Sequence, residues 1–374
     1  MSLPSKWLHI YDDFITKNAH QVAQIESTLR SLTYIIPGRF RDAEIASESI
    51  HSGVQLLSLY HDALLRRAHA VAKLAASQPS EPPSPHARYT RHWTNRSPLY
   101  RRVAYLLQVV QYVELLCEMA AKRRGGEQAR WRVVVLLESI KAICRLVLLR
   151  VTRSRPIVTP ALPERGPLPE EPPGNNNEYD EETLGMGEDD EDRGLLGSIG
   201  GSQNSTASAN NEWTMSRTGM SLPALPAPGD TSGFLLSRVL TADDIKPAAK
   251  LVNTLRGQAR AAEVLHILAP LVFAIALARC KDKRRAWTPW LLGVGTELAA
   301  RQLRDRGLRT TPLEREEWSR RAWSMGWWVM RGAFYENVTK GVVERVRRRM
   351  PGLLAGIVED YEYLWENYYY STST

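Results

Sequence analysis

An acidic segment rich in proline and glycine, in the middle of the chain, limits most strongly what this sequence can fold into. Between Arg155 and Ile245 there are sixteen acidic and five basic side chains, which is a net charge of −11. Like charges at this density repel one another, and too few apolar residues are present to offset the chain entropy lost on folding. We therefore expect residues 155–245 to be a long disordered acidic linker between an N-terminal block, 1–154, and a C-terminal block, 246–374.

The two flanking blocks have the periodicity of α-helices. Apolar residues recur three and four positions apart, and no hairpin turn signature or sustained alternating strand pattern interrupts them. Helices are expected in 19–36, 41–77, 98–123, 127–152, 246–280, 287–306, 312–337 and 338–370. Gly125 and Gly126 should turn the third and fourth of these into an antiparallel hairpin, and a proline-rich break is expected at 77–97. The predicted fold class is all-α, a helical membrane-associated bundle in two blocks.

Charge and aromatic composition both favour a boundary between apolar and aqueous surroundings. The whole chain has a net charge of +8, so the residues outside the acidic segment carry +19. It contains 11 Trp and 14 Tyr but only 5 Phe, and the two favoured aromatics combine an apolar ring with a polar group. Anionic lipid headgroups or an acidic protein would both attract such a surface.

No segment is an unambiguous transmembrane helix. Residues 131–151 have the right length, but Glu138, Lys141 and Arg145 near the middle would cost roughly 8 to 10 kcal/mol on insertion, against about −6 kcal/mol from the apolar residues. Residues 264–278 are uncharged but span only about 22 Å, less than a hydrocarbon core of about 30 Å. Either segment could lie in or on a membrane, or form the core of a soluble protein.

Basic and tryptophan residues follow the 264–278 run directly, as is typical of a headgroup boundary. The candidate membrane-contact residues are Trp131, Val264, Leu268, Leu271, Phe273, Trp287 and Trp290. The candidate basic residues at this boundary are Lys283, Arg284 and Arg285.

Catalytic and metal-binding patterns are missing from the sequence. There is no phosphate-binding glycine loop, no nucleophile elbow and no ligand spacing among Cys, His, Asp and Glu. The three cysteines are too few and too scattered for a disulfide framework. We expect no enzyme activity, no cofactor and no metal. Arginine clusters such as 345–349 are not framed by a nucleic-acid-binding motif, so no nucleic-acid partner is expected.

Two motifs resemble a known family. Leu32 to Asp42 reads LTYIIPGRFRD, with Pro37, Gly38, Arg39, Phe40 and Asp42 as the motif residues, and Trp287 to Leu292 reads WTPWLL around Pro289. Together with the tyrosine-rich C-terminus, these stretches resemble the sixteenth peroxin, a peroxisomal membrane biogenesis protein, in a fungal-type form. The resemblance covers nearly the whole chain outside the acidic segment.

This resemblance implies a non-enzymatic role in bringing peroxisomal membrane proteins into the endoplasmic reticulum or peroxisomal membrane. The implied partners are the third peroxin, the nineteenth peroxin, other peroxisomal membrane proteins and membrane lipids. Animal members depend on a basic helix for targeting, and the matching residues here are Arg66, Arg67 and Lys73. The alternative is a soluble helical adaptor that binds other proteins through its Trp-rich faces without touching a bilayer.

Overall fold

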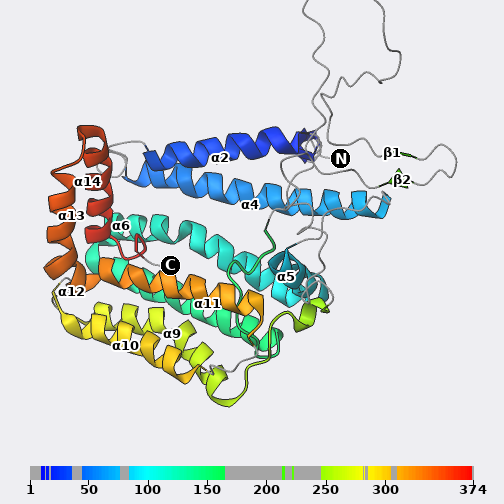
Figure 1. The fold of residues 1–374 in the computed structure, drawn as a ribbon. Coiled ribbons are helices and arrows are strands. Elements are labelled where there is room, and N and C mark those ends of the chain that lie inside the picture. Colours follow the sequence, from blue (N-terminus) through cyan, green and yellow to red (C-terminus); the bar gives the residue numbers. More distant parts are fainter. Residues whose placement is uncertain are drawn as a thin grey trace, which may run out of the picture. The chain divides into compact units, whose positions relative to one another are not determined.

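The computed structural model describes residues 10–12, 14–16, 18–35, 44–75, 84–164, 213–214, 221–222, 246–280, 282, 285–304 and 310–372. Over these residues the chain is helical apart from one short strand pair, so the all-α prediction is confirmed (Figure 1). Contacts divide the chain into one unit formed by Met1–Gly166 with Asp243–Thr374, and a second unit, Pro167–Ala242. The two expected helical blocks therefore belong to one unit.

The N-terminal helices pack through buried polar contacts. Helix α2 (Ala19–Ile35) lies along α4 (Glu44–Ala75), and the Glu26 carboxylate contacts the His61 ring and accepts a hydrogen bond of 3.0 Å from the Ser58 hydroxyl. Helix α4 in turn contacts the next long helix, where the Ser52 hydroxyl donates to the Tyr112 carbonyl at 2.9 Å. Because this contact has a separation of sixty residues, it ties the first helix pair to the rest of the unit.

A helix occupies most of the proline-rich break expected at 77–97. Helix α5 runs from Pro85 to Arg96, and the Ser84 hydroxyl accepts a hydrogen bond from the Ala87 amide. Proline at the first helical position costs no hydrogen bond, since that amide would have no partner within the helix. The prolines therefore mark a helix start here, and Tyr89 and Trp93 anchor the helix in the core.

The expected helical hairpin is present. Helix α6 (Pro98–Val151) is interrupted at Gly126, which has φ 66° and ψ −165°, and residues on either side of it meet across the turn. The Lys141 ammonium lies 2.8 Å from the Glu114 carboxylate, which comes from the opposite arm. We refer to residues 98–125 as the first arm of α6 and to residues 127–151 as its second arm.

The packed body continues past residue 154, where the sequence indicated the start of the linker. Val158, Ala161 and Leu162 are buried in the same core cluster as Tyr100, and the Tyr100 hydroxyl donates to the Ala161 carbonyl at 2.9 Å. Prolines at 156, 160 and 163 suggested a linker, but the apolar residues between them are enough to hold this irregular stretch against α6. The dense acidic run 178–192 lies outside the described residues.

The C-terminal half consists of helices that are shorter than expected. They are η1 (Ala248–Lys250), α9 (Gly257–Arg279), α10 (Trp287–Leu303), α11 (Pro312–Ser324), η2 (Met325–Met330), α12 (Gly332–Phe334), the π-helical turn η3 (Tyr335–Thr339), α13 (Lys340–Arg347) and α14 (Gly352–Asn367). The helix expected at 312–337 is broken where Arg331 is extended and Gly332 has φ 53°. The helix expected at 338–370 is split at Pro351, the N-cap residue of α14.

The second unit contains the one strand pair among the described residues. Strand β1 (Trp213–Thr214) pairs antiparallel with β2 (Ser221–Leu222), and Trp213 lies opposite Leu222. No strand was expected from the sequence, because a two-residue ladder is too short to produce an alternating pattern.

Candidate functional site

Charged residues of the α6 hairpin face protein and are paired there. Lys141 lies 2.8 Å from Glu114 and 2.7 Å from Glu138, and all three side chains are almost fully buried. Burial raises the pKa of Glu114 to about 7, although the nearby Lys141 acts in the opposite direction. Two of the three charges that made residues 131–151 a poor transmembrane segment, Glu138 and Lys141, are therefore paired inside the hairpin.

The C-terminal residues are held by a second buried carboxylate. Glu118 of α6 lies 2.8 Å from the Arg130 guanidinium and accepts hydrogen bonds from the Tyr369 and Tyr370 amides at 2.8 and 3.0 Å. The Tyr370 hydroxyl donates to the Val134 carbonyl at 3.1 Å. The tyrosine-rich end, which the sequence marked only as an aromatic cluster, thus closes the α6 hairpin.

A third buried pair joins α9 to α11. Arg321 forms contacts of 2.7 Å with Glu263 and 3.0 Å with Glu317, and these carboxylates raise the pKa of the arginine despite its burial. Glu263 also accepts from the Ile157 amide at 3.1 Å. The Glu263 carboxylate of α9 is therefore paired within the protein.

Helix α9 is long and apolar enough to cross a membrane, with a mean hydropathy of 2.1 over its most apolar window. Among the described helices, it is the one that meets these two criteria. Its most apolar window is 39% buried inside the protein. Every residue from Ala262 to Ala278 is buried or half-buried, with α6 on one side and α10 on the other. This helix is the centre of the C-terminal core.

Six of the seven candidate membrane-contact residues are buried or half-buried. Trp131 and Phe273 are buried together with Tyr369, so their surface is already covered by protein. Val264, Leu268 and Leu271 are half-buried and pack towards the second arm of α6.

The two tryptophans at the start of α10 differ from each other. The Trp290 ring stacks on Phe334 at 5.4 Å, and its Nε1 donates to the Trp328 carbonyl at 2.9 Å. Trp287 is the exposed member of the candidate set. Pro289 of the family motif is buried between them.

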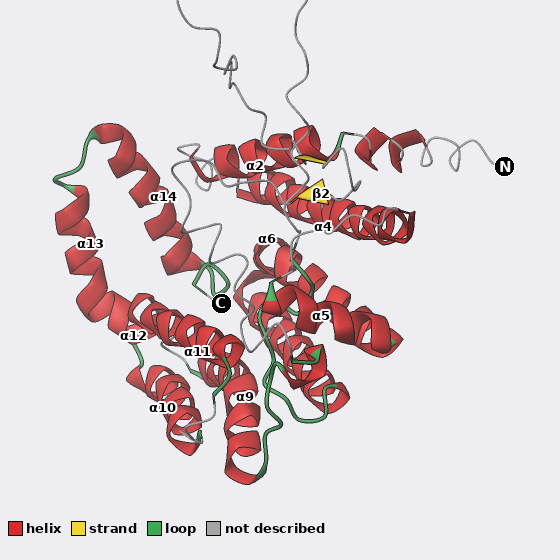
Figure 2. Cartoon of the chain, turned by 45° about the vertical axis from the view of Figure 1, so that its right-hand side comes forward, coloured by secondary structure: helices red, strands yellow, loops and turns green. Residues whose placement is uncertain are grey.

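The outward side of α10 has no charge. Figures 1 and 2 show this helix at the margin of the first unit, packed on α9. Its exposed residues are Trp287, Thr288, Leu291, Leu292, Gly295, Leu298, Ala299 and Gln302, which we call the outer face of α10. Trp287 and the three leucines are 42%, 58%, 46% and 47% exposed. The sequence placed Trp287 among the candidate residues and Leu291 and Leu292 next to them, but it gave no sign of Leu298, which follows Glu297.

A second exposed apolar stripe runs along α13. Val338, Val342 and Val346 are spaced four apart and are all exposed, and Arg345 and Arg349 are exposed beside them. An apolar stripe bordered by arginines is typical of a helix that lies on an anionic surface.

Only some of the predicted basic residues lie in the part of the chain that the structure describes. Arg285 is exposed at the start of α10, whereas Lys283 and Arg284 lie outside the described residues. The Arg66 guanidinium donates to the Tyr105 hydroxyl at 2.7 Å and to the Asp62 carbonyl. Arg67 and Lys73 lie on α4. The family-motif residues Pro37, Gly38, Arg39, Phe40 and Asp42 are also outside the described residues.

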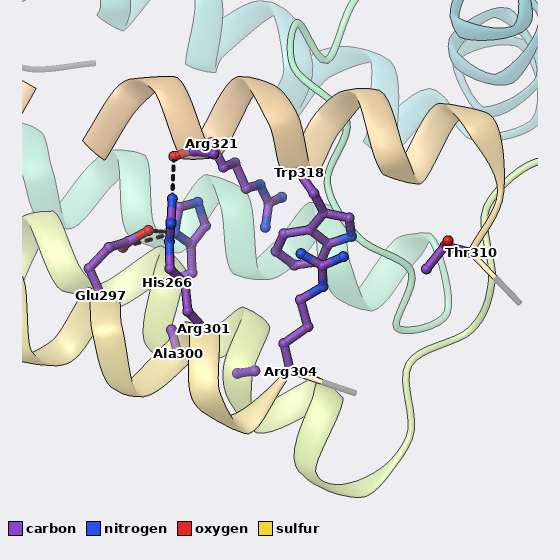
Figure 3. A pocket seen from close by; sticks show the side chains of 10 residues that line it. His266, Glu297, Ala300, Arg301, Arg304, Thr310, Trp318 and Arg321 are labelled. Carbon is purple, nitrogen blue, oxygen red and sulfur yellow. Dashed lines mark hydrogen bonds and ion pairs between the residues drawn. The ribbon is translucent and has the colours of Figure 1, made fainter. Parts of the chain in front are cut away.

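A pocket of about 410 Å³ opens between α9, α10 and α11 (Figure 3). Arg301 and Arg304 line it at the end of α10, and the Arg304 guanidinium carbon lies 3.7 Å from the centre of the Trp318 ring. His266 lies 2.8 Å from Glu297 on another wall. In the part of the chain that is described, no group of three or more His, Cys, Asp or Glu could hold a metal ion.

These features define a mainly helical protein in which Glu114, Glu118 and Glu263 are paired with buried basic residues, and in which α10 leaves an uncharged face exposed. The comparisons identify its family. The family model for peroxisomal membrane protein (Pex16) matches residues 9–367, so the chain belongs to the Pex16 family. It is therefore a peroxisomal membrane biogenesis factor, as the resemblance implied.

Two relatives agree with this family over nearly their whole length. A Schizosaccharomyces pombe protein named peroxisomal membrane protein PEX16 is 22% identical over 358 residues, which cover 91% of this chain and 90% of the relative. An Arabidopsis thaliana protein named peroxisome biogenesis protein 16 is 20% identical over 371 residues, covering 92% of each chain. No solved structure matches.

Proposed function

We propose that this protein is a non-enzymatic membrane platform that helps to insert or recruit peroxisomal membrane proteins at the endoplasmic reticulum or peroxisomal membrane. Family membership supports the role in biogenesis. The uncharged outer face of α10 is the observation that supports attachment to a membrane. The resemblance adds the third and nineteenth peroxins as partners. Other peroxisomal membrane proteins are its cargo.

The contact with the bilayer would be superficial. Fully burying a leucine or similar side chain is worth about 1.5–3 kcal/mol, and the four large side chains of the outer face are each about half exposed. Immersing them would therefore contribute roughly 4 kcal/mol, which is a weak and reversible attachment. Arg345 on α13 and Arg349, two residues beyond its end, could each add about 1 kcal/mol near an anionic leaflet.

The test places charges on the outer face. Leu291→Glu with Leu298→Glu changes two exposed side chains, so the fold should survive, and Leu136→Glu with Ile143→Glu is a matched control on the exposed side of α6. We expect the first pair to stop the purified protein from floating with vesicles, while the control pair floats as wild type does. Equal flotation of both pairs would contradict the assignment of α10, and wild type that does not float with vesicles would favour the soluble adaptor.

The same variants test the cellular role. In cells lacking this protein, a tagged peroxisomal membrane protein should lose its place in discrete organelles and regain it on re-expression of wild type. The α10 pair should fail to restore it, and the α6 pair should succeed. Substitutions are preferable to deleting 264–292, because that deletion would remove Phe273 and Ala274 from the core. Normal organelles in the absence of the protein would refute the role in biogenesis.

A further inference from the structure

Helix α5 and Arg155 contribute a cluster of buried polar side-chain atoms that lack a hydrogen-bond partner in the described part of the chain. The atoms are His86 Nδ1, the Tyr89 hydroxyl, His92 Nε2, Trp93 Nε1, and both Nε and Nη1 of Arg155. Tyr89 and Trp93 are only 1% and 5% exposed. Buried polar groups in folded proteins nearly always have a partner, so several unpartnered groups in one place indicate a ligand or a water that belongs there.

The unpartnered groups of Arg155, Trp93 and Tyr89 lie close together. The Arg155 guanidinium carbon lies 5.8 Å from the centre of the Trp93 ring, and the Tyr89 ring meets the same indole edge-on with 6.4 Å between the ring centres. Burial raises the pKa of the Tyr89 hydroxyl, whereas the nearby Arg155 acts in the opposite direction. The hydroxyl therefore stays protonated at neutral pH and is able to donate a hydrogen bond.

Most of these groups can only donate. An indole N–H and a guanidinium have no acceptor atom, so Trp93 and Arg155 cannot satisfy each other. At least three N–H groups of these two residues need an acceptor, and a single water molecule accepts only about two hydrogen bonds. An anion accepts hydrogen bonds from several directions at once and also neutralises the guanidinium, so it fits the cluster better than one water does.

The charge around the cluster is positive. Arg155 forms no ion pair among the described residues, and a buried charge without a partner is strongly unfavourable. Burial lowers the pKa of His92, and Arg96 and Arg155 lower it further. The carboxylate that acts on the cluster from α11, Glu314, is already bound by the Asn253 amide and side chain at 2.6 and 3.0 Å. The protein therefore leaves the Arg155 charge uncompensated.

We propose that a small inorganic anion, about the size of chloride, binds between the Arg155 guanidinium and the Trp93 indole N–H, with the Tyr89 hydroxyl as a third donor. Tyr89 and Trp93 belong to a core cluster, so a much larger ligand would displace core side chains. Arg155 is half-buried and long, so its side chain can move outwards to admit the ion. The bound anion would tie α5 to the residues that follow α6, independently of any membrane contact.

The test uses the full-length protein and compares its thermal unfolding in sodium chloride and in sodium gluconate at equal sodium concentration. Gluconate is a bulky organic anion and serves as the ion that the site excludes. Arg155→Gln removes the charged donor, and Arg153→Gln removes an exposed charge two residues away as the matched control. Tyr89→Phe, which removes only the hydroxyl, is a second site variant if Arg155→Gln fails to fold by circular dichroism.

We expect wild type and Arg153→Gln to unfold at a higher temperature in chloride than in gluconate. Arg155→Gln should bind chloride about tenfold or more weakly and lose this difference, and Tyr89→Phe should lose part of it. Because general effects of the salt act on all variants alike, the contrast between them reports the site. The same response in wild type and in the folded site variants would overturn the proposal.

Two direct readouts use the wild-type protein. Chloride should raise the pKa of His92 in an NMR titration, because an anion beside Arg155 opposes the effect of the arginine, and His92→Gln identifies the resonance. Crystals soaked in bromide should show anomalous density between Arg155 and Trp93. Density without an anomalous signal, together with an unchanged titration of His92, would show that water alone occupies the cluster and would refute the anion.

Discussion

Two glycines on α10 provide a stringent test of how this helix packs against its neighbours. At Gly293 an added Cβ would lie 2.2 Å from the Trp328 ring and 3.2 Å from Phe273, whereas at Gly295 it would meet nothing within 4 Å. Gly293 faces the core and Gly295 faces outward. The same substitution two residues apart should therefore have opposite effects.

The magnitudes follow from two terms. Replacing glycine by alanine inside a helix stabilises it by about 1 kcal/mol, and this term applies equally to both positions. Gly293→Ala also forces the Trp328 ring to move, and overpacking of a core costs about 1–3 kcal/mol. Trp328 has little freedom to move, because its ring packs edge-on against Phe273 at 5.0 Å and its carbonyl accepts from Trp290.

We therefore expect Gly295→Ala to raise the free energy of unfolding and Gly293→Ala to lie about 1–3 kcal/mol below it. Urea unfolding followed by circular dichroism measures both, provided that the slope of the transition is unchanged. Because the helix-propensity term cancels between the variants, their difference reports only the contact with Trp328. Equal midpoints would refute the described packing of α10 on η2.

Buried carboxylates of the α6 hairpin support two further predictions. Glu118→Ala removes the buried acceptor of Arg130 and of the Tyr369 and Tyr370 amides, and should cost about 3–5 kcal/mol in urea unfolding. Glu127→Ala, which removes an exposed contact with the same arginine, should cost at most about 1 kcal/mol, and similar losses for the two variants would refute the role of Glu118. The pKa of Glu114 is raised from 4.5 to about 7 by burial, so folding favours its protonated form, and that contribution is lost as pH rises from about 4.5 through 7. Because Gln resembles the protonated carboxyl, Glu114→Gln should gain stability relative to wild type over this range, and parallel urea midpoints at both ends would contradict the shift.

Local signals were enough to predict most of the helices. The glycine pair at 125 and 126 predicted the turn of the hairpin, and the expected helix at 19–36 agrees with α2 within one residue. Residues such as proline, which can either interrupt a helix or begin one, were less reliable guides. Pro85 was interpreted as part of a break, but it begins α5 because Ser84 caps the helix and Trp93 is buried.

Partnerships between distant residues could not be predicted in this way. The spacing of Glu114 and Glu118 places them on one face of the helix, but it does not say that Lys141 neutralises the first and that Arg130 and the Tyr369 amide bind the second. Glu118 and Tyr369 are 251 residues apart. Such pairs depend on how helices dock, and a single sequence carries no direct record of docking.

The helix that faces a membrane also cannot be chosen without knowing how the helices dock. Hydropathy favours α9, since it has the longest uncharged run, but Glu263 at its start is bound by Arg321 and its sides are covered by α6 and α10. Helix α10 has fewer apolar residues, yet it lies outside α9 and its exposed residues include no charge. A helix can meet lipid only with the side that protein leaves uncovered, so our proposal places the contact on α10 because of the arrangement of its exposed residues rather than its total hydropathy.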